Sequence, residues 1–170
     1  MKSLVRVALL GATMCGVLAS SAMAQESLFR STIIGSNPGI IIAGVQSGGA
    51  PWTVQRGSAV LNDAGRLHVE LRDLILPQLK GQPGPVTSVS ASLVCGGAGG
   101  VVVATTDAAP LSTDGNAEIE AQISISSPCF APIVLIRAAG FNGTPLPQPG
   151  PWIAATGFVA FSEDKDKQEN

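Results

Sequence analysis

The sequence contains no tyrosine, and aromatic residues make up only 4% of it. The lack of tyrosine disfavours a carbohydrate platform or an antibody-like surface, since both depend on amphipathic aromatic rings. A single histidine, His68, excludes zinc and copper sites built from three imidazoles. No Gly-x-Ser-x-Gly motif supplies a nucleophilic serine. We therefore expect no metal, no cofactor and no catalytic centre of these kinds.

Long apolar runs are absent except near the N-terminus, where residues 7–18 are mostly apolar. This run follows Lys2 and Arg6 and precedes the small-residue sequence Ala22-Met23-Ala24. About a dozen apolar residues are too few to span a bilayer, which takes about 20. The order basic, apolar, small is that of an export signal. We predict that residues 1–24 are a cleaved signal peptide and that the protein is secreted or periplasmic, with no membrane span after cleavage.

The rest of the chain is the size of one domain. We assign residues 25–161 to that domain and residues 162–170, which are all polar, to a disordered charged tail. Loss of Lys2 and Arg6 with the signal changes the formal net charge from −2 to −4. A weakly acidic chain has no electrostatic attraction for nucleic acid or for an anionic membrane surface.

Two cysteines, Cys95 and Cys129, remain after signal cleavage. In an oxidising compartment such a pair is expected to form a disulfide. Closure of a loop of about 34 residues stabilises a fold by roughly 3–4 kcal/mol in the chain-entropy model. The alternative, a reactive thiol or a metal-binding pair, is not favoured by the spacing or by the single histidine.

Alternation of apolar and polar residues predicts strands along the middle of the chain. In residues 66–72 every second side chain is apolar, and the others are charged or, at His68, an imidazole. This pattern is typical of a strand with one solvated face. The same pattern predicts strands in residues 86–95 and 117–125. Cys95 is in phase with the buried side, where a disulfide to a facing segment would staple the core.

Glycine, proline and asparagine separate these runs, and no helical period follows the signal. For example, residues 62–65 form a predicted hairpin turn in which Gly65 takes positive φ. The predicted strands are residues 28–34, 40–45, 52–61, 66–76, 86–95, 100–106, 117–125, 132–138 and 152–161. Such a series of short strands predicts an all-β protein, a single antiparallel β-sandwich that is immunoglobulin-like in general form. A small β-barrel is the alternative.

Both tryptophans, Trp52 and Trp152, follow a proline and precede a glycine at the same spacing. We favour the interpretation that each opens a strand and fills the core, because large aromatic residues usually do so. The alternative is that the two indoles form a ligand-binding surface for a sugar ring.

Two glutamates, Glu118 and Glu120, point to one face of a predicted strand about 7 Å apart. This separation falls in the range for inverting glycosidases. Alternating glutamates are also the ordinary polar half of a strand, and His68 on a solvated face is most often a cross-strand partner.

Three segments resemble those of a group of exported bacterial proteins of unassigned function. They are Gly48-Gly49-Ala50-Pro51-Trp52, Val94-Cys95-Gly96-Gly97 and Ser127-Pro128-Cys129-Phe130-Ala131-Pro132-Ile133. The resemblance covers roughly residues 44–137 and includes no catalytic motif. It implies an exported β-domain with a bridge between Cys95 and Cys129, and it implies no activity.

Three hypotheses of function follow. The first is a non-enzymatic binding or structural module of the cell envelope or exterior, with an unidentified protein or glycan as its partner. The second is a glycan-binding module that uses Trp52 and Trp152. The third, which we favour least, is a hydrolase that uses Glu118 or Glu120.

Overall fold

The structure is a computed structural model that describes residues 27–125 and 128–157. The predicted signal peptide, residues 1–24, and the predicted tail, residues 162–170, lie outside the described residues, as do residues 25–26 and 158–161 of the predicted domain. Within the described ranges the chain forms β-strands and two short 3-10 turns, and no α-helix. No helix in this part of the chain is long and apolar enough to cross a membrane.

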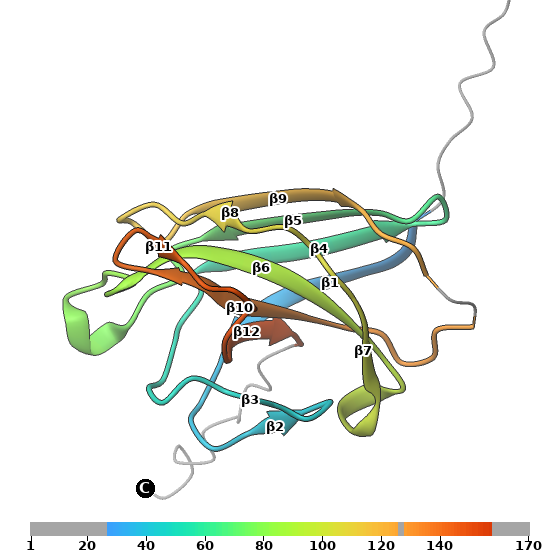
Figure 1. The fold of residues 1–170 in the computed structure, drawn as a ribbon, viewed down its shortest axis with the longest axis horizontal. Coiled ribbons are helices and arrows are strands. Elements are labelled where there is room, and N and C mark those ends of the chain that lie inside the picture. Colours follow the sequence, from blue (N-terminus) through green and yellow to red (C-terminus); the bar gives the residue numbers. More distant parts are fainter. Residues whose placement is uncertain (1–26, 126–127, 158–170) are drawn as a thin grey trace, which may run out of the picture.

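The all-β class predicted from the sequence is confirmed (Figure 1). The strands are β1 (Ser27–Gly35), β2 (Ile41–Ile42), β3 (Val45–Gln46), β4 (Arg56–Asn62), β5 (Arg66–Arg72), β6 (Val86–Cys95), β7 (Val101–Thr105), β8 (Ala109–Pro110), β9 (Ala117–Gln122), β10 (Ile133–Phe141), β11 (Thr144–Pro145) and β12 (Trp152–Thr156), with the 3-10 turns η1 (Pro77–Leu79) and η2 (Gly97–Gly99). One predicted strand, residues 40–45, is instead the small hairpin of β2 and β3. The short strands β8 and β11 were not predicted.

The main sheet is antiparallel and runs in the order β7-β6-β10-β12-β1-β4-β5-β9. Strand β1 joins its two halves, because residues 27–32 pair with β4 and residues 33–35 pair with β12. The sheet therefore curls into two packed layers, with β9, β5 and β4 in one and β6, β10 and β12 in the other (Figure 1). This half-barrel lies between the predicted sandwich and its barrel alternative.

The main core fills the space between the two layers. Leu67, Val69 and Leu71 of β5 are fully buried, as their alternation predicts. Burial of each such side chain contributes about 1.5–3 kcal/mol relative to an exposed one. The intervening side chains of β5, including His68, remain on the outer face.

The prediction of one solvated face is wrong for β6. Ser90 and Ser92 on that face are 1% and 0% exposed. The Ser92 hydroxyl is hydrogen-bonded to the Thr105 hydroxyl of β7 at 2.9 Å, and the hairpin of β2 and β3 packs over Val94 on the same face of β6. Under the hairpin lies a second apolar cluster built on Val94, Leu135, Trp152 and Ala155.

The hairpin between β4 and β5 turns at Gly65, which has φ of +80° as predicted. A Cβ at this position would overlap the carbonyl oxygen of Ile123, so the site requires glycine. The Gly65 carbonyl accepts a hydrogen bond from the Ile123 amide at 2.9 Å. The turn thus fixes the end of β9 against β5.

The predicted pairing of Cys95 and Cys129 is present, with Cα atoms 5.0 Å apart. The expectation that it joins facing segments across the core is wrong. Cys95 ends β6, and Cys129 precedes β10, the neighbour of β6 in the same sheet. The Gly96 amide also donates to the Phe130 carbonyl at 2.7 Å. The disulfide therefore closes a loop of the chain that contains β7, β8 and β9.

Candidate functional site

The main sheet does not close on itself between β8 and β9. In the described part of the chain, no backbone hydrogen bond joins residues 105–110 to residues 118–123. A groove of about 550 Å³ lies between these two segments. We call this groove the seam. Residues 111–116 connect its two walls, and the Ser112 amide donates to the Asn116 carbonyl there at 2.9 Å.

One backbone edge of β9 faces the seam. The Ile123 amide donates to Gly65 on the β5 side. Because successive residues of a strand direct their N–H and C=O groups to opposite edges, Ala117, Ile119 and Ala121 also point toward β5. The N–H and C=O groups of Glu118, Glu120 and Gln122 consequently point into the seam.

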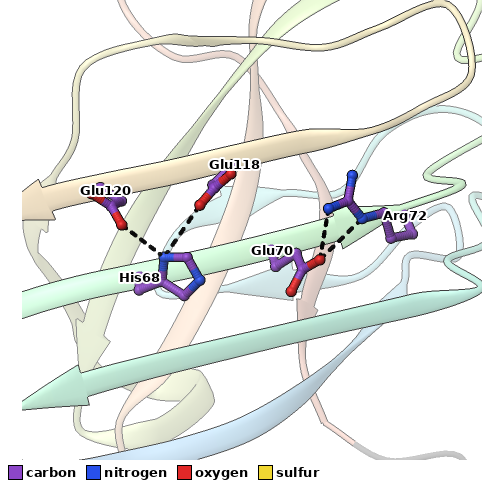
Figure 2. Close-up of polar contacts among 5 residues, drawn as sticks. All are labelled: His68, Glu70, Arg72, Glu118 and Glu120. Carbon is purple, nitrogen blue, oxygen red and sulfur yellow. Dashed lines mark hydrogen bonds and ion pairs between the residues drawn. The ribbon is translucent and has the colours of Figure 1, made fainter.

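Three polar side chains converge on the outer face beside the seam (Figure 2). His68 of β5 lies directly opposite Glu120 of β9, and Glu118 is its diagonal neighbour. His68 Nδ1 is 3.5 Å from Glu120 Oε1 and 3.9 Å from Glu118 Oε1. We call these three residues the His–Glu cluster.

Glu70 lies directly opposite Glu118, but its charge is already compensated. Its Oε1 accepts hydrogen bonds from Arg72 Nε at 3.0 Å and Arg72 Nη2 at 2.8 Å (Figure 2). Among the described residues, His68 is the only basic group within 4.0 Å of Glu118 or Glu120. The two carboxylates of the His–Glu cluster therefore lack a permanent cation.

The electrostatics of the cluster favour a positive charge at its centre. The carboxylate oxygens of Glu118 and Glu120 lie within 4.8 Å of each other. Two such charges repel by roughly 1 kcal/mol even in water. His68 Nδ1 has almost no accessible surface and no hydrogen-bond partner, although 37% of its side chain is exposed. A proton on Nδ1, a basic side chain or a metal ion at this point would relieve the repulsion.

The tryptophans do not form an exposed surface. Trp52 and Trp152 are 6% and 4% exposed, and they belong to the main core and to the second cluster respectively. A buried indole offers no face to a sugar ring, which agrees with the favoured interpretation of core filling rather than with a ligand-binding pair. Trp152 opens β12 as predicted, but the prediction that Trp52 opens a strand is wrong, since β4 begins at Arg56.

The predicted carboxylate pair does come together, but more closely than the inverting mechanism needs. The oxygens of Glu118 and Glu120 are within 4.8 Å, whereas inverting enzymes separate them by about 6.5–9.5 Å. The two side chains are 62% and 72% exposed. The geometry therefore does not fit the inverting mechanism. The separation is closer to that of retaining enzymes, about 5–5.5 Å, but a separation alone does not distinguish a hydrolase from two neighbouring surface glutamates.

The fold places this chain among all-β proteins with a curled antiparallel sheet. Comparison with protein-family models, with curated proteins and with solved structures finds no match. The resemblance to exported bacterial β-domain proteins thus stays a prediction. Sequence reasoning missed the seam, which depends on the placement of β8 beside β9, and the convergence of His68 with the glutamates, which depends on the register of β5 with β9.

Proposed function

We propose that the protein is an exported, non-enzymatic binding module that binds an extended segment of a partner protein along the free edge of β9. The single observation that carries this proposal is the row of backbone groups at Glu118, Glu120 and Gln122, which point into the seam without a partner strand in the described chain. Export rests on the predicted signal peptide, residues 1–24.

Strand addition is the binding mode that such an edge supports. An extended peptide satisfies the free N–H and C=O groups as the next strand of the sheet, at a spacing of about 4.8 Å. Near the turn, Cα atoms of β8 and β9 come within 8 Å of each other. A strand bound between β8 and β9 requires these two strands to be separated by about twice the strand spacing. We therefore place the partner at the far end of β9, beside Glu120 and Gln122.

Charge and burial define the chemistry of the partner. Its outward side chains would lie beside Glu120, with Glu118 next along β9, and Asp107 on the opposite wall is also exposed. Its inward side chains would face Ile119 and Ile123, which are buried. We therefore expect alternating basic and apolar residues in the bound segment.

The test uses a labelled peptide of alternating lysine and valine, of the same length as β9, with fluorescence anisotropy at low ionic strength. We expect Gln122→Pro to weaken binding at least tenfold, because proline lacks the N–H that faces the seam. Pairing with β5 is retained, since the Gln122 amide is not directed toward β5.

Gln122→Ala is the matched control. It loses the same contact between Gln122 Nε2 and the Ala64 carbonyl but keeps the backbone N–H, so it should bind like the unaltered protein. Circular dichroism checks that both variants are folded. Equal binding by the proline and alanine variants, or equal binding of a glutamate–valine peptide, would contradict strand addition by a basic segment.

A further inference from the structure

We infer that the His–Glu cluster is a binding site for one divalent transition-metal ion, for which Zn²⁺ is the experimental probe. The ligands are Nδ1 of His68 and one carboxylate oxygen each of Glu118 and Glu120. This inference goes beyond the proposed function, because it needs no partner protein and uses side chains where strand addition uses the backbone.

The geometry suits a small ion bound on one side by protein. Zinc binds imidazole nitrogen and carboxylate oxygen at about 2.0–2.2 Å, so its ligands lie about 3.4 Å apart in a tetrahedral site. The two distances from His68 Nδ1, 3.5 Å to Glu120 and 3.9 Å to Glu118, are close to that value. Small rotations of the exposed glutamate side chains would bring the carboxylate oxygens to the separation that the metal requires, while the register of β5 and β9 holds the backbones in place.

The imidazole distinguishes this site from an ordinary acidic cluster. His68 Nδ1 is almost inaccessible, has no hydrogen-bond partner and lies within 4.0 Å of a carboxylate oxygen of each glutamate. In the neutral tautomer with the proton on Nε2, Nδ1 presents a lone pair to the same point as the carboxylate oxygens. Three lone pairs that converge on one point can bind a cation together. Without a cation there, they repel one another.

The donor types select the class of metal. Imidazole favours zinc, copper and nickel, whereas calcium and magnesium prefer oxygen ligands alone. Two carboxylates neutralise the charge of a divalent ion, and three protein ligands leave a coordination position open. The expectation of no metal was based on the lack of three histidines, and that argument does not cover a site with one imidazole and two carboxylates.

Calorimetric titration of Zn²⁺ into the purified protein tests the site, with the protein made without a polyhistidine tag and kept in a reductant-free buffer cleared of chelators. We expect one ion per chain. His68→Ala and Glu120→Gln should each weaken binding at least tenfold. Glu70→Gln is the matched control on the same face, since Glu70 is engaged by Arg72, and it should bind as the unaltered protein does.

A thermal melt gives a second readout. Zn²⁺ should raise the melting temperature of the unaltered protein and leave that of His68→Ala unchanged, while circular dichroism confirms that the variant is folded. The inference is overturned if no ion binds, if His68→Ala binds zinc as tightly as the unaltered protein, or if Ca²⁺ binds as tightly as Zn²⁺.

Discussion

At the scale of the residue, Trp152 shows how the second apolar cluster is held together. Its indole packs with Val94, Leu135 and Ala155 beneath the hairpin of β2 and β3. The indole Nε1 is buried without a hydrogen-bond partner. The ring therefore stabilises the fold through apolar area, while its polar atom works against burial.

We expect Trp152→Ala to lower the free energy of unfolding by about 3–5 kcal/mol, the usual cost of truncating a large core aromatic residue. Trp152→Phe should cost clearly less, because it keeps a ring in place and removes the unpaired N–H. Urea denaturation of the two variants measures both values. Equal losses for alanine and phenylalanine would mean that the indole N–H has a partner after all.

Arg137 is a second residue with a structural task. Its Nε donates to the Gly150 carbonyl at 2.8 Å, and its Nη2 donates to the Pro149 carbonyl. Burial lowers the pKa of Arg137 below its usual value, because desolvation disfavours the charged form. The guanidinium thus anchors the proline-rich segment before β12 at some cost in hydration.

At the scale of the element, the sequence predicts the buried and exposed faces of β5 and β9, but it does not predict that the two strands pair. Alternation correctly places the buried face of β5 and puts Glu118 and Glu120 together on an outer face. Alternation is a property of neighbouring residues, so the two faces of a strand can be predicted from it without knowledge of the fold. The pairing of His68 with Glu120 is not local, since more than forty residues intervene, and no pattern within either strand specifies that register.

The same distinction explains the error on β6. Its serines look like a solvated face when read alone. They are buried, and a hairpin from a distant part of the chain packs over Val94 on the same face of β6. The curl of the sheet through β1 is likewise a result of packing between segments far apart in sequence.

Strand β9 joins the two proposals, because Glu118 and Glu120 belong both to the His–Glu cluster and to the wall of the seam. We expect zinc to weaken binding of the lysine–valine peptide severalfold, since the ion neutralises the carboxylates that attract basic side chains. Anisotropy titrations with and without Zn²⁺ measure the effect. In His68→Ala zinc should have no effect on the peptide, and stronger peptide binding with zinc would contradict the shared use of these carboxylates.

At the scale of the whole molecule, the disulfide between Cys95 and Cys129 limits how far the chain between β6 and β10 can spread when the protein unfolds. Reduction should lower the free energy of unfolding by about 3–4 kcal/mol, the loop-closure value for its 34-residue separation. Urea denaturation with and without reductant measures the change. The double variant Cys95→Ser and Cys129→Ser should match the reduced protein and should not respond to reductant; coincident transitions for oxidised and reduced protein would contradict the expectation.

The position of that bridge groups both ends of the sheet on one stretch of chain. Strands β7 and β9, the two ends of the curled sheet, lie on one covalently closed ring of chain together with β8. The surrounding frame of β1, β4, β6, β10 and β12 keeps its own pairings outside the ring. A single covalent bond therefore restrains both ends of the sheet, whose strands β7 and β9 are held to the frame through their pairings with β6 and β5.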